Sequence, residues 1–485
     1  MKFAATRAFG QSTDLPVKHS DTMPPLSRRS FLATSAAFAA APALCANAAP
    51  ADVDVAIVGA GAAGIAAARR IATAKARLAV IEAGNRVGGR CVTDGNFFGI
   101  PFDLGAHWMH NAEGNPLAKL APQIGLEIYP APRGQTMRVG PRNARDAEME
   151  NFLSNLVRSH RAIAAAGRAR TDIAAERALP RDLGNWKATI EFVLGPFACG
   201  KDLGQLSAVD LARVPERDIE AFCRQGYGAL LARLAADLPV QLAAPAQRIG
   251  WDRNGVDIAT ASGTVRARAA IVTASTNVLA ANRIEFKPDV PKRQLDAAAK
   301  LALGSYDHIA LEMPGNPLDL QRDDLVFEQS AGRQTAALLA NVSGTDLHLV
   351  EVCGAFGREL AAKGKGAMID FAGNWLASLF GSDVKNAIKR SHATRWNHES
   401  WILGAMSSAA PDATDARRIM MEPVGGRVWF AGEAVHETSW GTVDGAWESG
   451  VRAAEAALRR IGMLKPPEER RPAGHEPVRP KRRRR

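Results

Sequence analysis

The residues that decide the fold are Asp52–Gly84, which read DVDVAIVGAGAAGIAAARRIATAKARLAVIEAG. The apolar run Val53–Val58 predicts a short buried strand, and the alanine-rich segment after the glycines predicts a helix. A second apolar run, Leu78–Ile81, predicts another strand, which ends at Glu82. This order of strand, glycine-rich turn, helix and strand is typical of a βαβ unit.

Three glycines and one acid in this stretch have separate physical roles. Gly59 permits the tight turn, Gly61 lets the backbone approach a pyrophosphate, and Gly64 lets helix and strand pack closely. Phosphates favour a helix N-terminus, where free N–H groups and the helix dipole attract negative charge. Glu82 stands where a carboxylate accepts hydrogen bonds from a ribose diol. The stretch predicts a dinucleotide site, for FAD or NAD, formed by Gly59, Ala60, Gly61, Ala63, Gly64, Glu82 and Ala83.

Three further motifs separate these two cofactors. Gly88-Gly89-Arg90 follows the ribose acid, FDLGAHWMHNAEGNPL begins at Phe102, and RVWFAGEAVHETSWGTVDGAWESGVRAAEAAL begins at Arg427. In this order the motifs resemble those of the flavin-containing amine oxidases, the family of monoamine and polyamine oxidases. The resemblance covers about Asp52 to Leu458 and is weak between Arg138 and Arg217.

The resemblance implies bound FAD and assigns it to particular residues. Arg90 is expected to reach the diphosphate and flavin region, and Ala246 falls where the family binds adenine through its backbone. Thr442 is expected to begin a helix whose N-terminus stabilises negative charge on the reduced flavin. Ala405 stands where some members carry a flavin-linking cysteine, so noncovalent FAD is expected. Besides the first stretch, the implied cofactor residues are Gly89, Arg90, Gly105, Ala106, His107, Trp108, Ala246, Gly432, Glu433, Thr442 and Val443.

The expected fold class is α/β, with two domains. The resemblance implies a two-domain FAD-dependent oxidoreductase that combines a Rossmann-like FAD-binding domain with a discontinuous α+β substrate domain. A chain of 485 residues is long enough for this arrangement. The expected division gives residues 49–115, 216–282 and 391–464 to the FAD-binding domain, 116–215 and 283–390 to the substrate domain, 1–48 to a leader and 465–485 to a basic tail.

Local patterns predict two elements outside the first stretch. In VDIATASGTVRARAAIVTAS, which begins at Val256, Gly263 marks a turn between two strands. Residues 147–178 read as helical, with Phe152, Leu156 and Ile163 on one face.

One position departs from the family pattern in a way that bears on catalysis. Members commonly carry a lysine in a substrate-domain strand after "LG", and its ammonium holds a water near the flavin. This chain reads LALGSYDHIALEM, with His308 at that place. A histidine titrates near neutrality, so His308 could hold a water or act as a general base with a pH-dependent charge. Alternatively, it is only a polar residue that faces the cavity.

A second departure concerns the two aromatic rings that many members place before the flavin. The matching positions here are Met406 and Thr442, and neither is aromatic. Trp401 and Trp440 are close in sequence and could substitute from another direction. The expected catalytic residues are therefore His308, Met406, Trp401 and Thr442, in a cavity wider or differently polar than that of a monoamine oxidase.

The segment before the first strand reads as an export signal. Ser-Arg-Arg-x-Phe-Leu, with Arg28 and Arg29, is the twin-arginine signature, and a short apolar run and Ala46-Asn47-Ala48 follow it. The run is too short to span a bilayer, and Leu44 before Cys45 disfavours a lipid anchor. The twin-arginine (Tat) machinery carries folded proteins, which suits an enzyme that loads its cofactor in the cytoplasm. The signal predicts a periplasmic or secreted protein with no membrane span in the mature chain.

The charge of the chain does not indicate a nucleic-acid binder. The formal net charge is +11, but the segment from Pro466 onward carries eight Lys or Arg and only three Glu. The prolines and the high charge of this tail predict that it is solvated rather than packed against the protein. Cys91, Cys199, Cys223 and Cys353 lie far apart and show no metal-type spacing, so no metal site is expected.

These observations favour an exported FAD-dependent amine oxidase. An amine would give a hydride to the flavin and become an imine, which water hydrolyses to a carbonyl product. Oxygen, giving hydrogen peroxide, or another electron acceptor would then reoxidise the flavin. Two alternatives remain open: an FAD-dependent desaturase, isomerase or dehydrogenase of a non-amine substrate, and an FAD-binding protein without catalytic activity.

Overall fold

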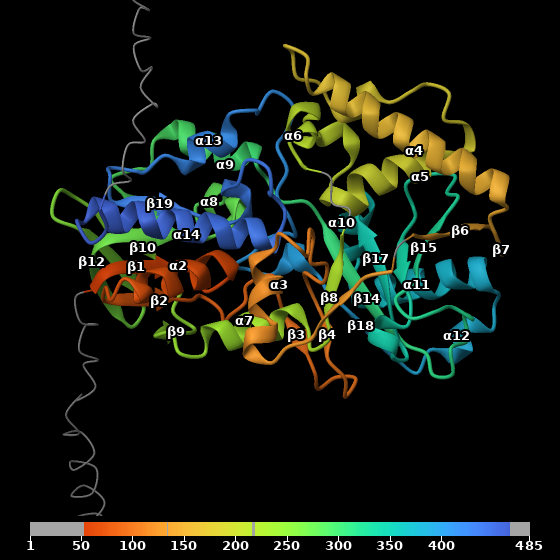
Figure 1. Cartoon of the computed structure of the whole chain (residues 1–485), viewed down its shortest axis with the longest axis horizontal. Helices are drawn as coiled ribbons and strands as arrows, with labels where there is room; N and C mark the ends of the chain where they lie inside the picture. The colour runs from red at the N-terminus through yellow and green to blue at the C-terminus, as the bar shows by residue number, and fades with distance from the viewer. Residues whose placement is uncertain (1–52, 133, 216–218, 466–485) are drawn as a thin grey trace, which may run out of the picture. The chain divides into compact units, whose positions relative to one another are not determined.

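The computed structural model of the chain describes residues 53–132, 134–215 and 219–465 (Figure 1). The predicted leader, with its twin arginines, and the predicted tail from Pro466 lie outside these residues. The described residues contain an eight-stranded sheet, a seven-stranded sheet and two small two-stranded sheets.

The eight-stranded sheet is built around the strand predicted at the start of the sequence analysis. β1 (Val53–Val58) pairs in parallel with β2 (Leu78–Ile81) on one side and with β12 (Gly263–Val272) on the other, so both predicted strands are confirmed. Its side chains are buried on both faces, as is usual for a central parallel strand. The strand order is β13-β10-β11-β12-β1-β2-β9, with β19 also on β12; the other bounds are β9 Val240–Gln241, β10 Arg248–Trp251, β11 Val256–Thr260, β13 Glu285–Lys287 and β19 Val428–Phe430.

Two helices from opposite ends of the chain pack together on one face of this sheet. α2 (Ala62–Thr73) follows the glycine-rich turn, and α14 (Val443–Arg460) lies beside it (Figure 1). The two helices are so close that a Cβ on Gly450 would lie only 2.1 Å from the carbonyl oxygen of Ala63. The other helices of this part are α7 Tyr227–Ala235, α8 Thr276–Ala280, α9 Lys292–Lys300 and α13 Ala416–Met421.

The seven-stranded sheet carries the strand with His308. β14 (Tyr306–Glu312) pairs antiparallel with β17 (Leu347–Cys353) and β18 (Arg390–Ala393). Helix α11 (Lys365–Phe380) packs on this sheet over a core that includes Ile309 and Leu311. The strand order is β18-β14-β17-β16-β15-β6-β7, with β6 Thr136–Val139, β7 Arg142–Asn143, β15 Leu325–Glu328 and β16 Ala337–Leu339.

Two short strands near the predicted boundaries at 282 and 390 pair across them. β13 lies beyond 282 but pairs with β10 in the first sheet. β18 begins at Arg390 and runs beyond the predicted end of the substrate segment, yet it pairs with β14 in the second sheet. Both strands are too short to show a period, so only their partners reveal where they belong.

The predicted helix at 147–178 is shorter than expected. α4 runs Asp146–Ala166, and residues 175–178 form a separate 3-10 turn. A Cβ on Gly167 would lie 2.3 Å from Cβ of Ala212, so the chain passes helix α6 (Ala208–Ala212) too closely for a side chain at that position. The predicted hairpin at 256–272 is confirmed by the antiparallel pairing of β11 and β12.

Smaller elements connect the two sheets. β3 (Thr93–Asp94) pairs with β4 (Phe102–Asp103), and β5 (Ile128–Pro130) pairs with β8 (Ala221–Cys223). Among the described residues, no helix is long and apolar enough to cross a membrane, no disulfide forms, and no group of acids, histidines and cysteines could hold a metal ion. The remaining helices are α3 Pro116–Leu120, α5 Lys187–Phe192, a π-helix η4 Val193–Phe197, α6 Ala208–Ala212, α10 Gly354–Ala362 and α12 Val384–Ala387.

Candidate active site

One large cavity of about 820 Å³ joins the two sheets. Its lining begins at the carboxyl end of β1, where Val58 and Gly59 stand, and continues to Tyr306 and His308 on β14. Ligands of open α/β sheets bind beyond the carboxyl ends of the strands. The cavity therefore lies where the βαβ unit predicts a dinucleotide.

The glycines at the end of β1 are required by close contacts. Gly59 has φ +103°, and a Cβ on Gly64 would lie 1.9 Å from the carbonyl oxygen of Gly59. A Cβ on Gly89 would lie 3.2 Å from Cα of Gly61. No side chain caps the N-terminus of α2, so its backbone N–H groups remain available to an anion beside Gly61 and Ala63.

Glu82 is held by the backbone of the same loop. Its Oε2 accepts a hydrogen bond from the N–H of Ala60 at 2.6 Å, and its Oε1 accepts one from Gly84 at 2.7 Å. An ionised carboxylate has about four acceptor sites, so it retains capacity for the hydroxyl groups of a ribose. The carboxylate is thus oriented at the cavity wall before any ligand binds.

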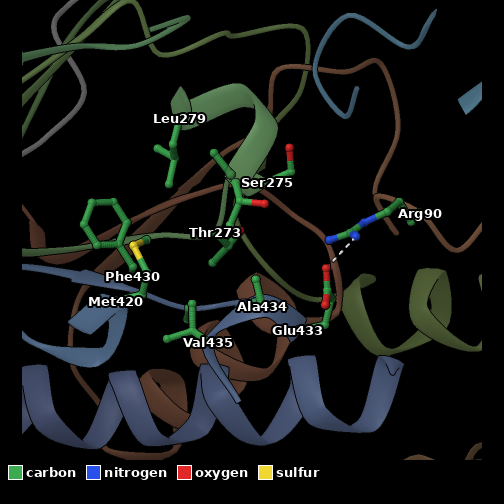
Figure 2. A pocket seen from close by; sticks show the side chains of 13 residues that line it. Arg90, Thr273, Ser275, Leu279, Met420, Phe430, Glu433, Ala434 and Val435 are labelled. Carbon is green, nitrogen blue, oxygen red and sulfur yellow. Dashed lines mark hydrogen bonds and ion pairs between the residues drawn. The ribbon is translucent and has the colours of Figure 1, made fainter. Parts of the chain in front are cut away.

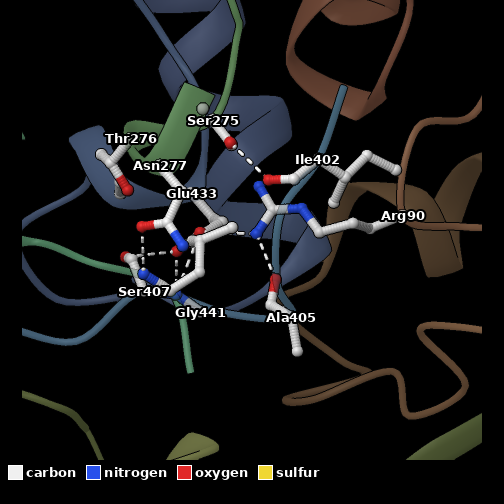
Figure 3. A network of polar contacts seen from close by, with 12 residues as sticks. Arg90, Ser275, Thr276, Asn277, Ile402, Ala405, Ser407, Glu433 and Gly441 are labelled. Carbon is white, nitrogen blue, oxygen red and sulfur yellow. Dashed lines mark hydrogen bonds and ion pairs between the residues drawn. The ribbon is translucent and has the colours of Figure 1, made fainter. Parts of the chain in front are cut away.

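A second group of polar contacts centres on Glu433 (Figure 3). Arg90 donates to Oε1 of Glu433 at 2.8 Å and also to the carbonyl oxygen of Ala405. Ser407 donates through its backbone N–H at 3.1 Å and its hydroxyl at 2.6 Å, and the N–H of Gly441 adds a bond of 2.9 Å. These bonds tie three separate segments of the cavity wall together.

The charge of Glu433 is stabilised inside the protein. Burial by itself raises the pKa of its carboxyl group, but attraction to Arg90 and the hydrogen bonds from Ser407 and Arg90 outweigh it, so the pKa is lowered. Figure 2 shows Arg90 and Glu433 facing each other at a smaller pocket that also contains Thr273 and Ser275. All four residues line the large cavity as well.

The helix predicted to start at Thr442 is confirmed. Thr442 is the N-cap of α14, and its hydroxyl accepts a hydrogen bond from the N–H of Gly445 at 3.0 Å. Thr442 and Val443 both line the cavity. The N-terminus of α14 therefore directs partial positive charge toward the cavity.

The structure brings nearly all of the predicted cofactor residues to this one cavity. Ala60 and Gly64 are the exceptions: Ala60 holds Glu82 through its backbone, and Gly64 packs against Gly59. The predicted residues that line the cavity are Gly59, Gly61, Ala63, Glu82, Ala83, Gly89, Arg90, Gly105, Ala106, His107, Trp108, Ala246, Gly432, Glu433, Thr442 and Val443.

His107 and Trp108 are held by packing rather than by hydrogen bonds. His107 is 5% exposed, and its Nδ1 lies 3.4 Å from Oδ2 of Asp103. Among the described residues, the two ring nitrogens of His107 and the indole nitrogen of Trp108 have no hydrogen-bond partner. Both rings pack against Phe222, at centroid distances of 4.4 and 4.7 Å. Both residues line the cavity, but their ring nitrogens are buried.

His308 lies on the opposite side of the cavity, but its ring nitrogens face the protein. Nδ1 donates to the carbonyl oxygen of Asp103 at 3.0 Å, and Nε2 lies 3.5 Å from Oε1 of Glu351. Glu351 is fully buried and is the cross-strand neighbour of His308 on β17.

The ionisation of this pair corrects the expectation that His308 titrates near neutrality. Burial is the largest effect and lowers the pKa of His308 to about 4, with the nearby His107 acting in the same direction. Burial also raises the pKa of Glu351 to about 7. At neutral pH His308 is uncharged, unlike the lysine that the family commonly carries there.

The other predicted catalytic residues also line the cavity. Met406, Thr442 and the 39% exposed Trp401 all contribute to its wall. Trp440 does not contribute: it is buried, and the guanidinium of Arg417 lies 4.7 Å from the centre of its ring. Of the two tryptophans considered as replacements for the missing aromatic pair, only Trp401 reaches the cavity.

Several cavity residues were missed by the sequence analysis. Tyr306 was detectable, because it lies two residues before His308 on the same strand and therefore on the same face. Leu194, Phe197 and Leu325 belong to no motif. His110 pairs with Glu220 at 2.7 Å, across a sequence separation that no local pattern spans.

The fold and the cavity define a two-domain FAD-binding oxidoreductase. The glycine cradle, the oriented Glu82, the open N-terminus of α2 and the cationic Arg90 match a dinucleotide with a diphosphate, and the cavity continues from them to the second sheet.

The chain belongs to the family described as flavin containing amine oxidoreductase, which matches residues 62–458, and FAD is its cofactor. It is similar to lysine-specific histone demethylase 2 of Homo sapiens, with 27% identity in an alignment 440 positions long, gaps included, which covers 82% of this chain and 53% of that protein. It thus spans about half the length of this relative. Polyamine oxidase 4 of Oryza sativa subsp. japonica is 25% identical in an alignment 472 positions long, gaps included, which covers 85% of this chain and 90% of the oxidase.

Solved structures of two oxidases share the fold. Cyclohexylamine oxidase from Brevibacterium oxydans has a TM-score of 0.72 and 23% identity over 84% of this chain and 99% of that chain. A double mutant of putrescine oxidase has a TM-score of 0.73 and 19% identity, with the same coverage of 84% and 99%. These similarities show that the chain shares the fold of these oxidases.

Proposed function

We propose that the chain is an exported FAD-dependent amine oxidase that converts a small-molecule amine to an imine, which water hydrolyses to a carbonyl compound. The observation that carries the proposal is the continuity of one cavity from the predicted FAD cradle at Gly59 and Glu82 to the side chains of the second sheet at Tyr306 and His308. A cofactor and a small organic substrate can therefore meet inside it.

Different residues of the cavity would have different roles in this reaction. Bound FAD supplies the acceptor for the hydride of the α-carbon, which is chemistry that no protein side chain offers. Arg90 and Glu433 fix the cavity wall, and the N-terminus of α14 offers partial positive charge where negative charge develops. The amine must reach the cavity without its proton, because only a neutral amine can give up a hydride readily. His308 is neutral and both of its ring nitrogens face the protein, so we assign it to the shape of the site and not to proton removal.

An anaerobic screen of amines against the purified yellow protein tests the activity. We expect at least one amine to bleach the flavin absorbance and to yield an aldehyde or ketone in equal amount. Admitting air afterwards identifies the acceptor, because an oxidase regains its colour within seconds and produces hydrogen peroxide. Failure of every amine to bleach a flavin that dithionite does reduce would reject the proposal.

A second candidate is a flavin enzyme that desaturates or isomerises carbon–carbon bonds. It is favoured by Met406 and Thr442, which line the cavity where many amine oxidases carry aromatic rings, and by the uncharged His308. Bleaching by an unsaturated or saturated lipid, and by no amine, would support this candidate over the first.

Export is the second part of the proposal and rests on Arg28 and Arg29. We expect the wild-type chain to reach the periplasm or medium with FAD bound and the double variant Arg28→Lys, Arg29→Lys to remain in the cytoplasm. A variant that changes Arg7 alone, outside the signature, serves as control. Equal export of the double variant would contradict the assignment.

A further inference from the structure

The end of the cavity formed by the second sheet has an apolar wall. It is lined by Val193, Leu194 and Phe197 of the π-helix η4, by Tyr306 of β14 and by Leu325 of β15. We call these five residues the apolar wall. Four of them have hydrocarbon side chains. The fifth, Tyr306, is uncharged at neutral pH, and burial raises its pKa further above the usual value.

The apolar wall is backed by a packed core, so its shape is fixed. The ring of Phe197 lies 6.1 Å from that of Tyr306 and 5.0 Å, edge to face, from that of Phe327. Phe327 is 1% exposed, whereas Phe197 keeps part of its surface open to the cavity. Pro196 lies within the π-helix, a rare element that often occurs at functional sites.

Three of the four carboxylates that line the cavity are engaged on the cofactor side. Glu82 accepts hydrogen bonds from the cradle backbone. Glu433 is paired with Arg90. Glu399 acts electrostatically on Arg86, which also lines the cofactor side. None of these acids belongs to the elements that form the apolar wall.

The remaining acids near the substrate side are also unsuited to hold a second cation. Glu220 faces His110, with Oε2 2.7 Å from Nδ1. Glu351 lies behind both His308 and Tyr306, is fully buried and does not line the cavity. A cationic group placed against the apolar wall would lose its water and meet no carboxylate that lines this part of the cavity.

We propose that the substrate is a monoamine whose remaining part is apolar or aromatic and packs against the apolar wall, and that diamines and polyamines are poor substrates. Burial of apolar surface stabilises such a substrate, whereas burial of an unpaired ammonium is strongly unfavourable. This inference rests on the proposed amine oxidation and narrows its substrate class.

A matched pair of amines tests the inference on the wild-type holoenzyme. n-Hexylamine and hexamethylenediamine have the same carbon chain and differ by one terminal ammonium. We expect hexylamine to reduce the flavin anaerobically with an apparent second-order rate constant at least about 100-fold higher. Equal rates, or a faster reaction with the diamine, would overturn the inference and leave the proposed amine oxidation intact. Reduction by neither of these amines nor by any other amine would instead reject the proposed function and, with it, this inference.

A substituted wall residue separates the charge argument from simple fit. Leu194→Asp places a carboxylate in the apolar wall, and Leu194→Asn places a neutral side chain of the same shape there. We expect the Asp variant to lower the monoamine-to-diamine ratio by at least about tenfold relative to the Asn variant. Leu325→Asp and Leu325→Asn on β15 provide the same comparison from a different element if the first pair fails to retain flavin. An unchanged ratio in a yellow Asp variant at either position would overturn the inference.

Discussion

The two walls of the cavity are built by different means. On the cofactor side, the cradle from Gly59 to Glu82 consists of glycines, backbone N–H groups and a helix N-terminus that follow directly from one another along β1, α2 and β2. The substrate side consists of side chains that come from strands and helices far apart in sequence, such as Phe197, Tyr306 and Leu325.

This difference teaches which substitutions each wall tolerates. A backbone cradle has no side chain to exchange, so added atoms disrupt it. A wall of side chains from separate elements can change chemically while the fold persists, as His308 and Met406 show by departing from the family pattern at the cavity wall. The effects of substitutions on the two sides should therefore differ, both in their magnitude and in the property that changes.

The largest effect is expected on the cofactor side, at Gly64. Gly64→Ala places a Cβ 1.9 Å from the carbonyl oxygen of Gly59, so α2 must move away from β1 and the cradle opens. We expect the purified variant to contain almost no flavin, measured as the ratio of visible to ultraviolet absorbance. Gly95→Ala is the matched control, because Gly95 has no atom within 4 Å of an added Cβ. A Gly64→Ala protein that retains its flavin would contradict the view that added atoms disrupt the backbone cradle.

The next effect concerns the ion pair that ties the wall segments together. Arg90→Met leaves Glu433 buried without its partner, which is expected to lower the free energy of unfolding by about 3 kcal/mol. Denaturant titration of the holoprotein measures the change. Arg266→Met, which removes an exposed pair with Asp257 at 3.6 Å, should change the stability by less than about 1 kcal/mol. Equal losses of unfolding free energy in the two variants would contradict the expectation that the buried ion pair matters more than the exposed one.

On the substrate side, the pair His308 and Glu351 predicts opposite pH dependences. The pKa of His308 is lowered to about 4 in the folded state, so the unfolded state binds more protons and stability rises with pH between about 4 and 6.5. The pKa of Glu351 is raised to about 7, so the folded state binds more protons and stability falls as pH rises from about 4.5 to 7. In the wild type these two contributions nearly cancel.

Single variants reveal each contribution. Relative to the wild type, Glu351→Gln should become more stable as pH rises from 4.5 to 7, by up to about 3 kcal/mol, because only the His308 contribution remains. His308→Asn should become less stable over the same range. Unfolding by denaturant at several pH values measures both slopes. The assignment fails if the two variants change their slope in the same direction.

The smallest effect is expected where a side chain supports the backbone cradle. Thr442→Ala removes the hydroxyl that caps α14 and should lower the free energy of unfolding by about 1 kcal/mol. Thr442→Ser keeps the hydroxyl and should lose less than half of this amount. Thermal unfolding of the two variants compares them, and a Ser variant as unstable as the Ala variant would argue against capping.

Local pattern was sufficient for the first half of the fold. β1, β2 and the hairpin of β11 and β12 were predicted, because buried runs, glycine turns and a βαβ order are readable over short windows. The helix from 147 was extended too far, because its end is set by the contact between Gly167 and α6, more than 40 residues away. The pairings of β13 and β18 across the predicted boundaries at 282 and 390 were not foreseen, because a short strand is assigned by its partner.

The site divides in the same way. Motif residues such as Glu82, Arg90 and Glu433 were recognised from sequence, and the structure places them around one cavity. Tyr306 was overlooked although it shares a face with His308. Glu351 had no detectable signal, because its proximity to His308 depends on the register between β14 and β17.

The sequence by itself determined the dinucleotide cradle, because a glycine-rich turn between a strand and a helix has one favourable conformation and its ligand contacts are made by the backbone. It also determined the family, because several motifs occur in the same order. Only the tertiary structure decided the neutral state of His308 and the apolar character of the opposite wall. Both depend on burial and on neighbours brought together by strand pairing, and neither burial nor pairing is a property of a short segment.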